Sequence, residues 1–384
     1  MGILTVTAKI KLYTDESQNA LLYSTMRQYR DACNFVAEYV FRTHDLKQAS
    51  LNKALYYEIR SRFGLGAQFT QSVLKTVIAR YKTILENEKT WVRPDFKKPQ
   101  LDLVWNRDYS LTKSKFSVNT LQGRLKLDYC STGMESYFDS SVYSFGTAKL
   151  VLKHQKYYLH IPVSCEVPDV DLSDTCNIVG IDRGINFIVA TYDSKGVFGF
   201  ISGRSIKQRR GHYRQVRLEL QRRQTPSARR RLKAIGNREN RWIQDVNHCV
   251  SKALVTQYPE YTLFVLEDLT DIHKKYMVKL KSKRARQNRN MLVSWAFYDL
   301  EQKLKYKAIQ HGQMVINVNP AYTSQMCPKC GHTEQANRNK RDHVFCCKNC
   351  GYQSNDDRIG AMNLYRKGIE YISSNVVPDT VTCE

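Results

Sequence analysis

The N-terminal hundred residues combine one alternating apolar pattern with long helical periodicities. Residues 3–13 alternate between apolar and polar side chains, which predicts a β-strand. Asp15 followed three residues later by Gln18 has the form of a capping box, so a helix is predicted over residues 16–42. A second helix is predicted over about 68–89. Its apolar face consists of Phe69, Val73, Val77, Tyr81 and Ile84.

Residues 99–180 have a different texture, with short runs of β character such as KFSVNTL and RLKLDY. A single strand requires partners, so residues 3–13 are predicted to join this later sheet. The helical segment 15–98 then becomes an insertion in a β-rich domain formed by residues 1–14 and 99–178.

The second half of the chain alternates between strands and helices. Residues 177–202 predict an antiparallel meander of three strands. The continuously apolar run at 261–269 predicts a buried strand. Helices are predicted over about 205–257, 291–311 and from 357 onward, with a short strand in MVINVN.

The charge balance points to a polyanionic partner. The chain of 384 residues carries 60 Lys and Arg against 36 Asp and Glu, a formal net charge of +24. Such a surplus is typical of nucleic-acid-binding proteins. An anionic membrane is the alternative, but no apolar run reaches about 18 residues and no signal peptide opens the chain. We therefore expect a soluble, cytoplasmic, nucleoid-associated protein.

Two pairs of cysteines have metal-ligand spacing. Cys327 and Cys330, a 16-residue spacer, then Cys347 and Cys350 match a four-thiolate zinc ribbon, and a glycine follows each pair. Cys346 is an alternative to Cys347, but only Cys347 preserves the two-residue spacing. The alternative reading is four buried free cysteines. Four thiolates leave no open coordination position, so the zinc is predicted to be structural.

Three carboxylates follow apolar strands or begin a helix. Asp182 ends the run VGID, Glu267 ends LFVLE, and Asp357 begins the last helix. Taken singly, each reads as a strand-end or N-cap residue. Taken together, they are the oxygen ligands that Mg²⁺ or Mn²⁺ requires beside a phosphate, and two such ions can hydrolyse a phosphodiester. The order of meander, helical crossover, later strand and final helix resembles the RNase H-like nuclease fold in its RuvC form. Lone histidines such as His248 and His311 read as helix hydrogen-bonding residues.

The segment from Trp295 to Leu364, with YKA…G…V…P.YTSQ.C..CG, resembles TnpB, the nuclease encoded by bacterial insertion sequences, and the related compact type V CRISPR effectors. GIDRGI around Asp182, VLEDL around Glu267, QDVNH at 244–248 and, weakly, KLYTDESQ extend this resemblance over the chain.

The resemblance implies RuvC acids at Asp182, Glu267 and Asp357 and zinc ligands at Cys327, Cys330, Cys347 and Cys350. The family usually has Asp two positions before the third acid and Asn two positions after it. Here these positions are Asn355 and Ile359, which leaves Asp356 as a weaker candidate ligand.

The resemblance also implies a multidomain α+β architecture. Its parts are a β-barrel wedge domain (1–14 and 99–178), a helical recognition lobe (15–98), a RuvC-like nuclease domain (179–322 and 354–370), a zinc-ribbon insertion that binds target nucleic acid (323–353) and a tail (371–384).

Two segments are strongly basic. Residues 204–241 contain fourteen Lys and Arg against two acids, and residues 272–290 contain eight and none. Such density favours salt-sensitive phosphate binding over a merely solvated helix face, and interleaved tyrosines offer stacking surfaces. The predicted contacts are Arg209, Arg210, Arg214, Arg229, Arg230, Arg231, Lys281, Lys283, Arg284 and Arg286.

The leading interpretation is an RNA-guided DNA endonuclease with Mg²⁺ or Mn²⁺ at a single two-metal site, structural Zn²⁺, and guide RNA and target DNA as partners. Base pairing would read the target, and the protein would read a short flanking motif. Two alternatives stay open: an unguided structure-selective nuclease or transposition accessory, and a DNA-binding repressor that does not cleave.

Overall fold

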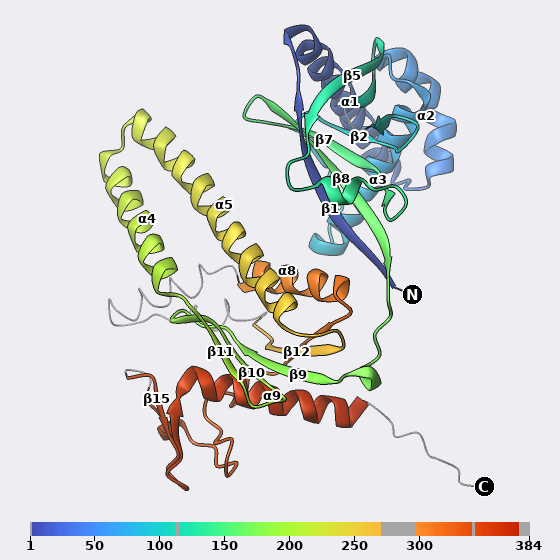
Figure 1. The fold of residues 1–384 in the computed structure, drawn as a ribbon. Helices are drawn as coiled ribbons and strands as arrows, with labels where there is room; N and C mark the ends of the chain where they lie inside the picture. Colours follow the sequence, from blue (N-terminus) through green and yellow to red (C-terminus); the bar gives the residue numbers. More distant parts are fainter. Residues whose placement is uncertain (1, 113–114, 270–296, 340–341, 376–384) are drawn as a thin grey trace, which may run out of the picture. The chain divides into compact units, whose positions relative to one another are not determined.

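The computed structural model describes residues 2–112, 115–269, 297–339 and 342–375. The chain divides into two compact units, one covering Ile3–Glu166 and the other beginning at Val167. Each unit is described by itself (Figure 1). None of the described helices combines the length and apolar character that a membrane span requires.

A strongly curled, nearly closed sheet forms the first unit. Its strands follow the order β2-β7-β8-β1-β5-β4-β3, and β6 pairs with β8. The strand bounds are β1 (Gly2–Tyr13), β2 (Gln100–Leu103), β3 (Tyr109–Leu111), β4 (Phe116–Thr120), β5 (Gly123–Cys130), β6 (Ser144–Phe145), β7 (Ala148–Lys153) and β8 (Lys156–Val167). Because β1 lies between β8 and β5, the prediction that the N-terminal strand joins the later sheet is confirmed.

Three helices, α1 (Glu16–Thr43), α2 (Gln48–Phe63) and α3 (Ala67–Glu88), separate β1 from the other strands. The predicted capping box is present: the Gln18 N–H donates to Asp15 at 2.8 Å, and the Asp15 N–H donates to Gln18 at 3.1 Å. The predicted apolar face of α3 is buried. Helices and sheet share one continuous hydrophobic core, whose largest members are Tyr29, Tyr81, Tyr109, Phe116 and Tyr157.

The second unit is built on a five-stranded sheet of order β11-β10-β9-β12-β13. The strands are β9 (Asn177–Asp182), β10 (Phe187–Asp193), β11 (Phe198–Ser202), β12 (Thr262–Glu267) and β13 (Met314–Val318). The first three form the predicted antiparallel meander, and β12 runs parallel to both β9 and β13.

Helices cover the two faces of this sheet. They are α5 (Pro226–Gln257), α8 (Phe297–Gln310) and α9 (Asp356–Asn375), whereas α4 (Arg204–Arg223) packs along α5. Val179 and Phe264 point into a core shared with α5 and α8, whereas Ile178 and Val265 lie on the opposite face, where α9 packs. Figure 1 shows α9 along one side of the sheet and α5 and α8 on the other.

The cysteine segment between β13 and α9 has a small sheet of its own. Strands β14 (Arg338–Asn339), β15 (Val344–Cys346) and β16 (Gln353–Asn355) pair antiparallel in that order. β16 leads directly into α9. The segment therefore ends where the candidate third acid begins.

Candidate functional site

The alternation of strands β9 and β12 brings Asp182 and Glu267 to the same face of the sheet. Residues two apart on a strand share a face, so Asp182 lies on the face of Ile178, and Glu267 on that of Val265. The parallel register pairs Leu266 with Ile181, which makes the two acids neighbours across the strands. That face is the one that α9 covers.

Asp357 reaches the same place from the first turn of α9. Its charge and that of Glu267 both act on Asp182. The Asn355 side chain accepts a hydrogen bond from the Asp357 N–H at 3.0 Å, so Asn355 caps this end of the helix. Asp182 and Glu267 are thus adjacent across the strands, and Asp357 is near enough for its charge to act on Asp182. Within 4.8 Å, the candidate ligand atom of Asp357 groups with those of His343 and Asp356.

Glycines allow α9 to approach β9 closely. A Cβ atom on Gly180 would lie 2.1 Å from the carbonyl oxygen of Ala361, and one on Gly360 would lie 2.6 Å from a carboxylate oxygen of Asp182. Both distances are too short for a real contact. The absence of a side chain at Gly360 is thus part of what leaves room for the Asp182 carboxylate.

Substituting Gly360 with Ala is expected to displace Asp182 or the start of α9 and to impair any activity of the acid cluster by at least about tenfold. The reason is that a displacement of a catalytic group by about 1 Å can lower the rate of the catalysed reaction by about 10²-fold. Cation binding at the acids, measured by titration, reports the change. Gly236→Ala is the matched control: its Cβ would meet no atom within 4 Å, and Ala stabilises a helix by roughly 1 kcal/mol relative to Gly. Equal behaviour of the two variants would contradict this account.

Burial and mutual repulsion raise the pKa values of two of the acids. Burial raises the pKa of Asp182 well above its usual value, and the charges of Glu267 and Asp357 raise it further. Burial also raises the pKa of Asp357, together with the adjacent Asp356 charge. Crowded carboxylates of this kind fit hard divalent cations, which neutralise the repulsion and prefer oxygen ligands.

Asp182→Asn is expected to raise the melting temperature of the metal-free protein at about pH 8. The folded pKa of Asp182 lies above its unfolded value, so the ionised carboxyl destabilises the fold as pH rises through the folded pKa. The difference from wild type should shrink as pH falls toward about 3, where the carboxyl is mostly protonated in both states. Thermal melts in EDTA check this. The melting temperature of Asp182→Asn should exceed that of wild type by a few degrees, since about 1 kcal/mol of stability shifts a melting temperature by about 2–4 °C. A lower melting temperature at about pH 8 would contradict the expectation.

Hydrogen bonds fix the end of β12. The Thr323 hydroxyl donates to the Glu267 carboxylate. The buried Asn363 amide, on α9, holds the carbonyls of Thr323 and Met326 at 2.7 and 2.8 Å. Glu267 is therefore oriented by the chain segment that enters the cysteine region, a role that the sequence did not indicate for Thr323 or Asn363.

Arg183 ties the strand ends to α8. Its guanidinium donates to the Glu267 backbone carbonyl at 2.5 Å and to the Glu301 carboxylate at 3.0 Å. The Arg183 side chain is 1% exposed. Removing one partner of such a buried pair costs about 3–5 kcal/mol, so this pair holds Asp182 and Glu267 on a rigid frame.

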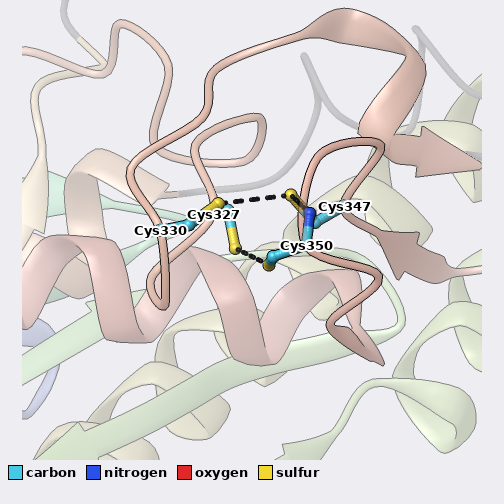
Figure 2. A group of neighbouring side chains, drawn as sticks. All are labelled: Cys327, Cys330, Cys347 and Cys350. Atoms are coloured by element: carbon cyan, nitrogen blue, oxygen red, sulfur yellow. Dashed lines mark hydrogen bonds between the residues drawn. The ribbon is translucent and has the colours of Figure 1, made fainter.

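The four predicted thiol ligands lie together. Cys327 and Cys350 have sulfur atoms 3.6 Å apart, and Cys330 and Cys347 have theirs 3.5 Å apart (Figure 2). All four sulfurs fall within 4.8 Å of one another. Such a four-thiol cluster fits zinc.

Two local features shape this cluster. Gly331 and Gly351, which follow the two pairs, have φ values of 73° and 71°, the left-handed conformation expected at each turn. Cys346 lies outside the cluster on β15, where the Gln353 amide contacts its sulfur at 3.6 Å. Of the two adjacent cysteines, Cys347 is thus the one that faces the other three sulfurs.

The first turn of α9 also joins the cysteine segment. Asp356 is 1% exposed; Arg338 donates to one of its carboxylate oxygens at 2.8 Å, and His343 contacts the other at 3.3 Å. The candidate ligand atoms of His343, Asp356 and Asp357 lie within 4.8 Å of one another. Ile359 is fully buried in a small core with Cys327, Phe345 and Cys347, which accounts for an apolar residue at that position.

The basic residues differ in their surroundings. Arg229, Arg230 and Arg231 are exposed near the start of α5. Arg209 is also exposed and lies 4.5 Å above the Trp242 ring. Arg214 is half-buried.

Arg210 is mostly enclosed. Its side chain is 12% exposed and lies 3.8 Å from Glu239 of α5, so part of its charge is used between α4 and α5. Lys281, Lys283, Arg284 and Arg286 lie outside the described residues.

Two family models match consecutive parts of the chain. Residues 160–294 match the family described as "Probable transposase" (OrfB of IS605), and residues 297–364 match the "Cas12f1-like, TNB domain". The predicted resemblance to the TnpB family is confirmed. The Cas12f1-like model covers the cysteine cluster and the start of α9.

Curated relatives point the same way. A "CRISPR-associated endodeoxyribonuclease Cas12f1" of Syntrophomonas palmitatica is 26% identical over 69% of this chain and 55% of its own length. A TnpB-like protein of Methanocaldococcus jannaschii is 35% identical over 34% of this chain and 44% of its own. The "Putative RNA-guided DNA endonuclease InsQ" of Escherichia coli is 28% identical over 56% of this chain and 54% of its own. The matched part thus spans about half the length of each relative.

Solved structures share the fold. CasPhi-2 (Cas12j) bound to crRNA superimposes with a TM-score of 0.57 at 10% identity, covering 95% of this chain and 98% of that one. The mini RNA-guided endonuclease CRISPR-Cas phi3 gives a TM-score of 0.53 at 12% identity, covering 96% and 93%. The mixed α/β, multidomain fold of this chain therefore resembles that of Cas12 effectors.

Proposed function

We propose that this chain is an RNA-guided DNA endonuclease that hydrolyses target DNA at a single RuvC-like site. The observation that carries the proposal is the placement of Asp182 and Glu267 side by side at the ends of two parallel strands, under the helix whose first turn carries Asp357. Three antiparallel strands followed by two parallel ones, flanked by helices on both faces, is the arrangement expected of an RNase H-like nuclease. The names of the relatives Cas12f1 and InsQ support the same activity.

The three carboxylates are assigned as ligands of two Mg²⁺ or Mn²⁺ ions. When bound, such ions activate a water molecule and stabilise the leaving oxygen of a phosphodiester. The chain's own contribution is to hold the acids rigidly: β9 and β12 supply two of them, and the capped start of α9 supplies the third. Thr323 and Arg183 keep Glu267 and its strand in place.

The roles of the other domains are assigned from the resemblance to the TnpB family. Residues 1–14 and 99–178 would form the wedge domain and residues 15–98 the recognition lobe. Residues 179–322 and 354–370 would form the nuclease domain, interrupted by the zinc ribbon at 323–353. Exposed arginines of α4 and α5, such as Arg209 and Arg230, would contact phosphates of the guide or the target. A short flanking DNA motif would license target recognition.

The test of this function is to express the protein with its own genomic flanks, purify it, and sequence the RNA that accompanies it. A discrete RNA with a constant scaffold and one end that varies with the flanking sequence is the expected result. Heterogeneous RNA or none, together with metal-dependent cleavage, would favour an unguided nuclease. Binding without any cleavage would favour a repressor.

A further inference from the structure

A chain of polar contacts links α4 to the cysteine segment and to the first turn of α9. Lys207 on α4 lies 3.4 Å from the Asn186 side-chain oxygen, in the turn between β9 and β10. The Asn186 amide lies 2.7 Å from Nε2 of His343. His343 in turn contacts Asp356 through Nδ1, and Arg338 contacts the other oxygen of Asp356.

The Asn186 amide nitrogen lies 2.7 Å from Nε2 and 3.5 Å from Nδ1 of His343, and this nitrogen can only donate. In the tautomer that carries its proton on Nδ1, His343 donates to Asp356. Arg338 donates to the second carboxylate oxygen through both Nε and Nη2, each at 2.8 Å. Both oxygens of Asp356 thus contact side chains of the cysteine segment.

Asp357 has a different environment. It is the neighbour of Asp356 on the first turn of α9, and its own charge reaches Asp182. Both carboxylates lie near His343, but of the two it is Asp356 that pairs with Arg338. Asp357 also reaches the turn between β9 and β10, where a Cβ atom on Gly184 would lie 3.7 Å from one of its carboxylate oxygens.

We propose that Asp356 and His343 are positioning residues: they latch the ribbon onto the first turn of α9 and thereby aim the Asp357 carboxylate at the cation site. The inference rests on the proposed function only for the identity of that site. Partners that orient a metal ligand usually contribute 10–100-fold to metal affinity. Ile359 packs in the ribbon core with Cys327 and Phe345. This apolar contact also holds the first turn of α9 against the ribbon.

Mn²⁺ binding to the purified, zinc-loaded chain tests this latch, because it requires neither guide nor DNA. Calorimetric titration would compare wild type with Asp357→Asn, Asp356→Asn and the control Glu334→Gln. Glu334 is a suitable control because it is another carboxylate of the ribbon that pairs with a histidine, His332 at 3.1 Å, on an exposed surface.

Asp357→Asn should remove at least one bound Mn²⁺. Asp356→Asn should keep the stoichiometry but weaken Mn²⁺ affinity by about 10–100-fold, with zinc content unchanged, and cleavage should recover at high metal concentration. Glu334→Gln should match wild type. A lower Mn²⁺ stoichiometry in Asp356→Asn would make Asp356 a ligand and overturn the inference. An Mn²⁺ affinity of Asp356→Asn equal to that of Glu334→Gln would also overturn it. So would a wild-type protein that binds no Mn²⁺.

His343 supplies the second arm, which also serves if Asp356→Asn fails to fold. Its φ of 56° lies in the left-handed region that Asn adopts readily. His343→Asn keeps a side-chain N–H for Asp356 and should retain most of the affinity, whereas His343→Leu should weaken it about tenfold or more. Equal affinities for the two variants would overturn the latch. Absence of guided cleavage in a wild type whose Mn²⁺ binding follows this pattern would overturn the proposed function alone.

Discussion

Alanine at Asp182, Glu267 or Asp357 is expected to reduce DNA cleavage by about 10⁴-fold or more while nucleic-acid binding stays within a few-fold of wild type. Removing one residue of a catalytic group that acts as a unit can lower the rate of the chemical step by about 10⁴-fold or more. A large effect is expected because the three acids are proposed to hold the same cations. Nucleic-acid binding should persist because it is assigned to basic surfaces elsewhere.

Single-turnover cleavage and filter binding at matched salt would measure the two effects separately. Glu370→Ala is the control, since Glu370 is an exposed acid on the same helix as Asp357, and it should cleave like wild type. If two of the three variants still cut, the assignment of the metal ligands is wrong.

Cys347→Ser is expected to abolish stoichiometric zinc binding and unfold the cysteine segment, whereas Cys346→Ser should retain both zinc and fold. Structural zinc contributes an apparent 10–16 kcal/mol in small zinc-binding peptides, so losing one thiolate is a large change. The adjacent pair is informative because only Cys347 faces the other three sulfurs. Cleavage should fall with zinc, since Ile359 joins the ribbon core to the turn that carries Asp357.

Zinc content per chain, measured by elemental analysis, and limited proteolysis across 323–355 would check this pair of variants. Zinc retained in Cys347→Ser and lost in Cys346→Ser would reverse the assignment of the fourth ligand.

The features that could be predicted from the sequence are those with a local signal. Alternation over residues 3–13 and the pairing of Asp15 with Gln18 depend on neighbours a few positions apart, and both predictions are confirmed. The placement of Asp182 at a strand end followed from an apolar run that stops at a carboxylate. The choice of Cys347 over Cys346 also depended on a local signal, namely the two residues that separate Cys347 from Cys350.

Features that depend on distant pairing could not be predicted. The contact of Arg210 with Glu239 joins α4 to α5, and it had no local signal in the sequence; the role of Arg210 as a phosphate contact stays a prediction. His343 carries no motif, and its role emerges only when the ribbon meets Asn186 and Asp356. Arg183 next to Asp182 pairs with Glu301 across more than a hundred residues. Such contacts are set by strand register and helix packing.

The most direct test of the central claim is cleavage of plasmid DNA in Mg²⁺ by the purified protein and a guide RNA. This RNA has the scaffold of the RNA that purifies with the protein and a variable end of chosen sequence. Changing the variable end of that RNA should move the cut to the newly complementary sequence, and Asp357→Ala should abolish cutting at both targets. Cutting that ignores the RNA sequence, or that persists in Asp357→Ala, would contradict the account.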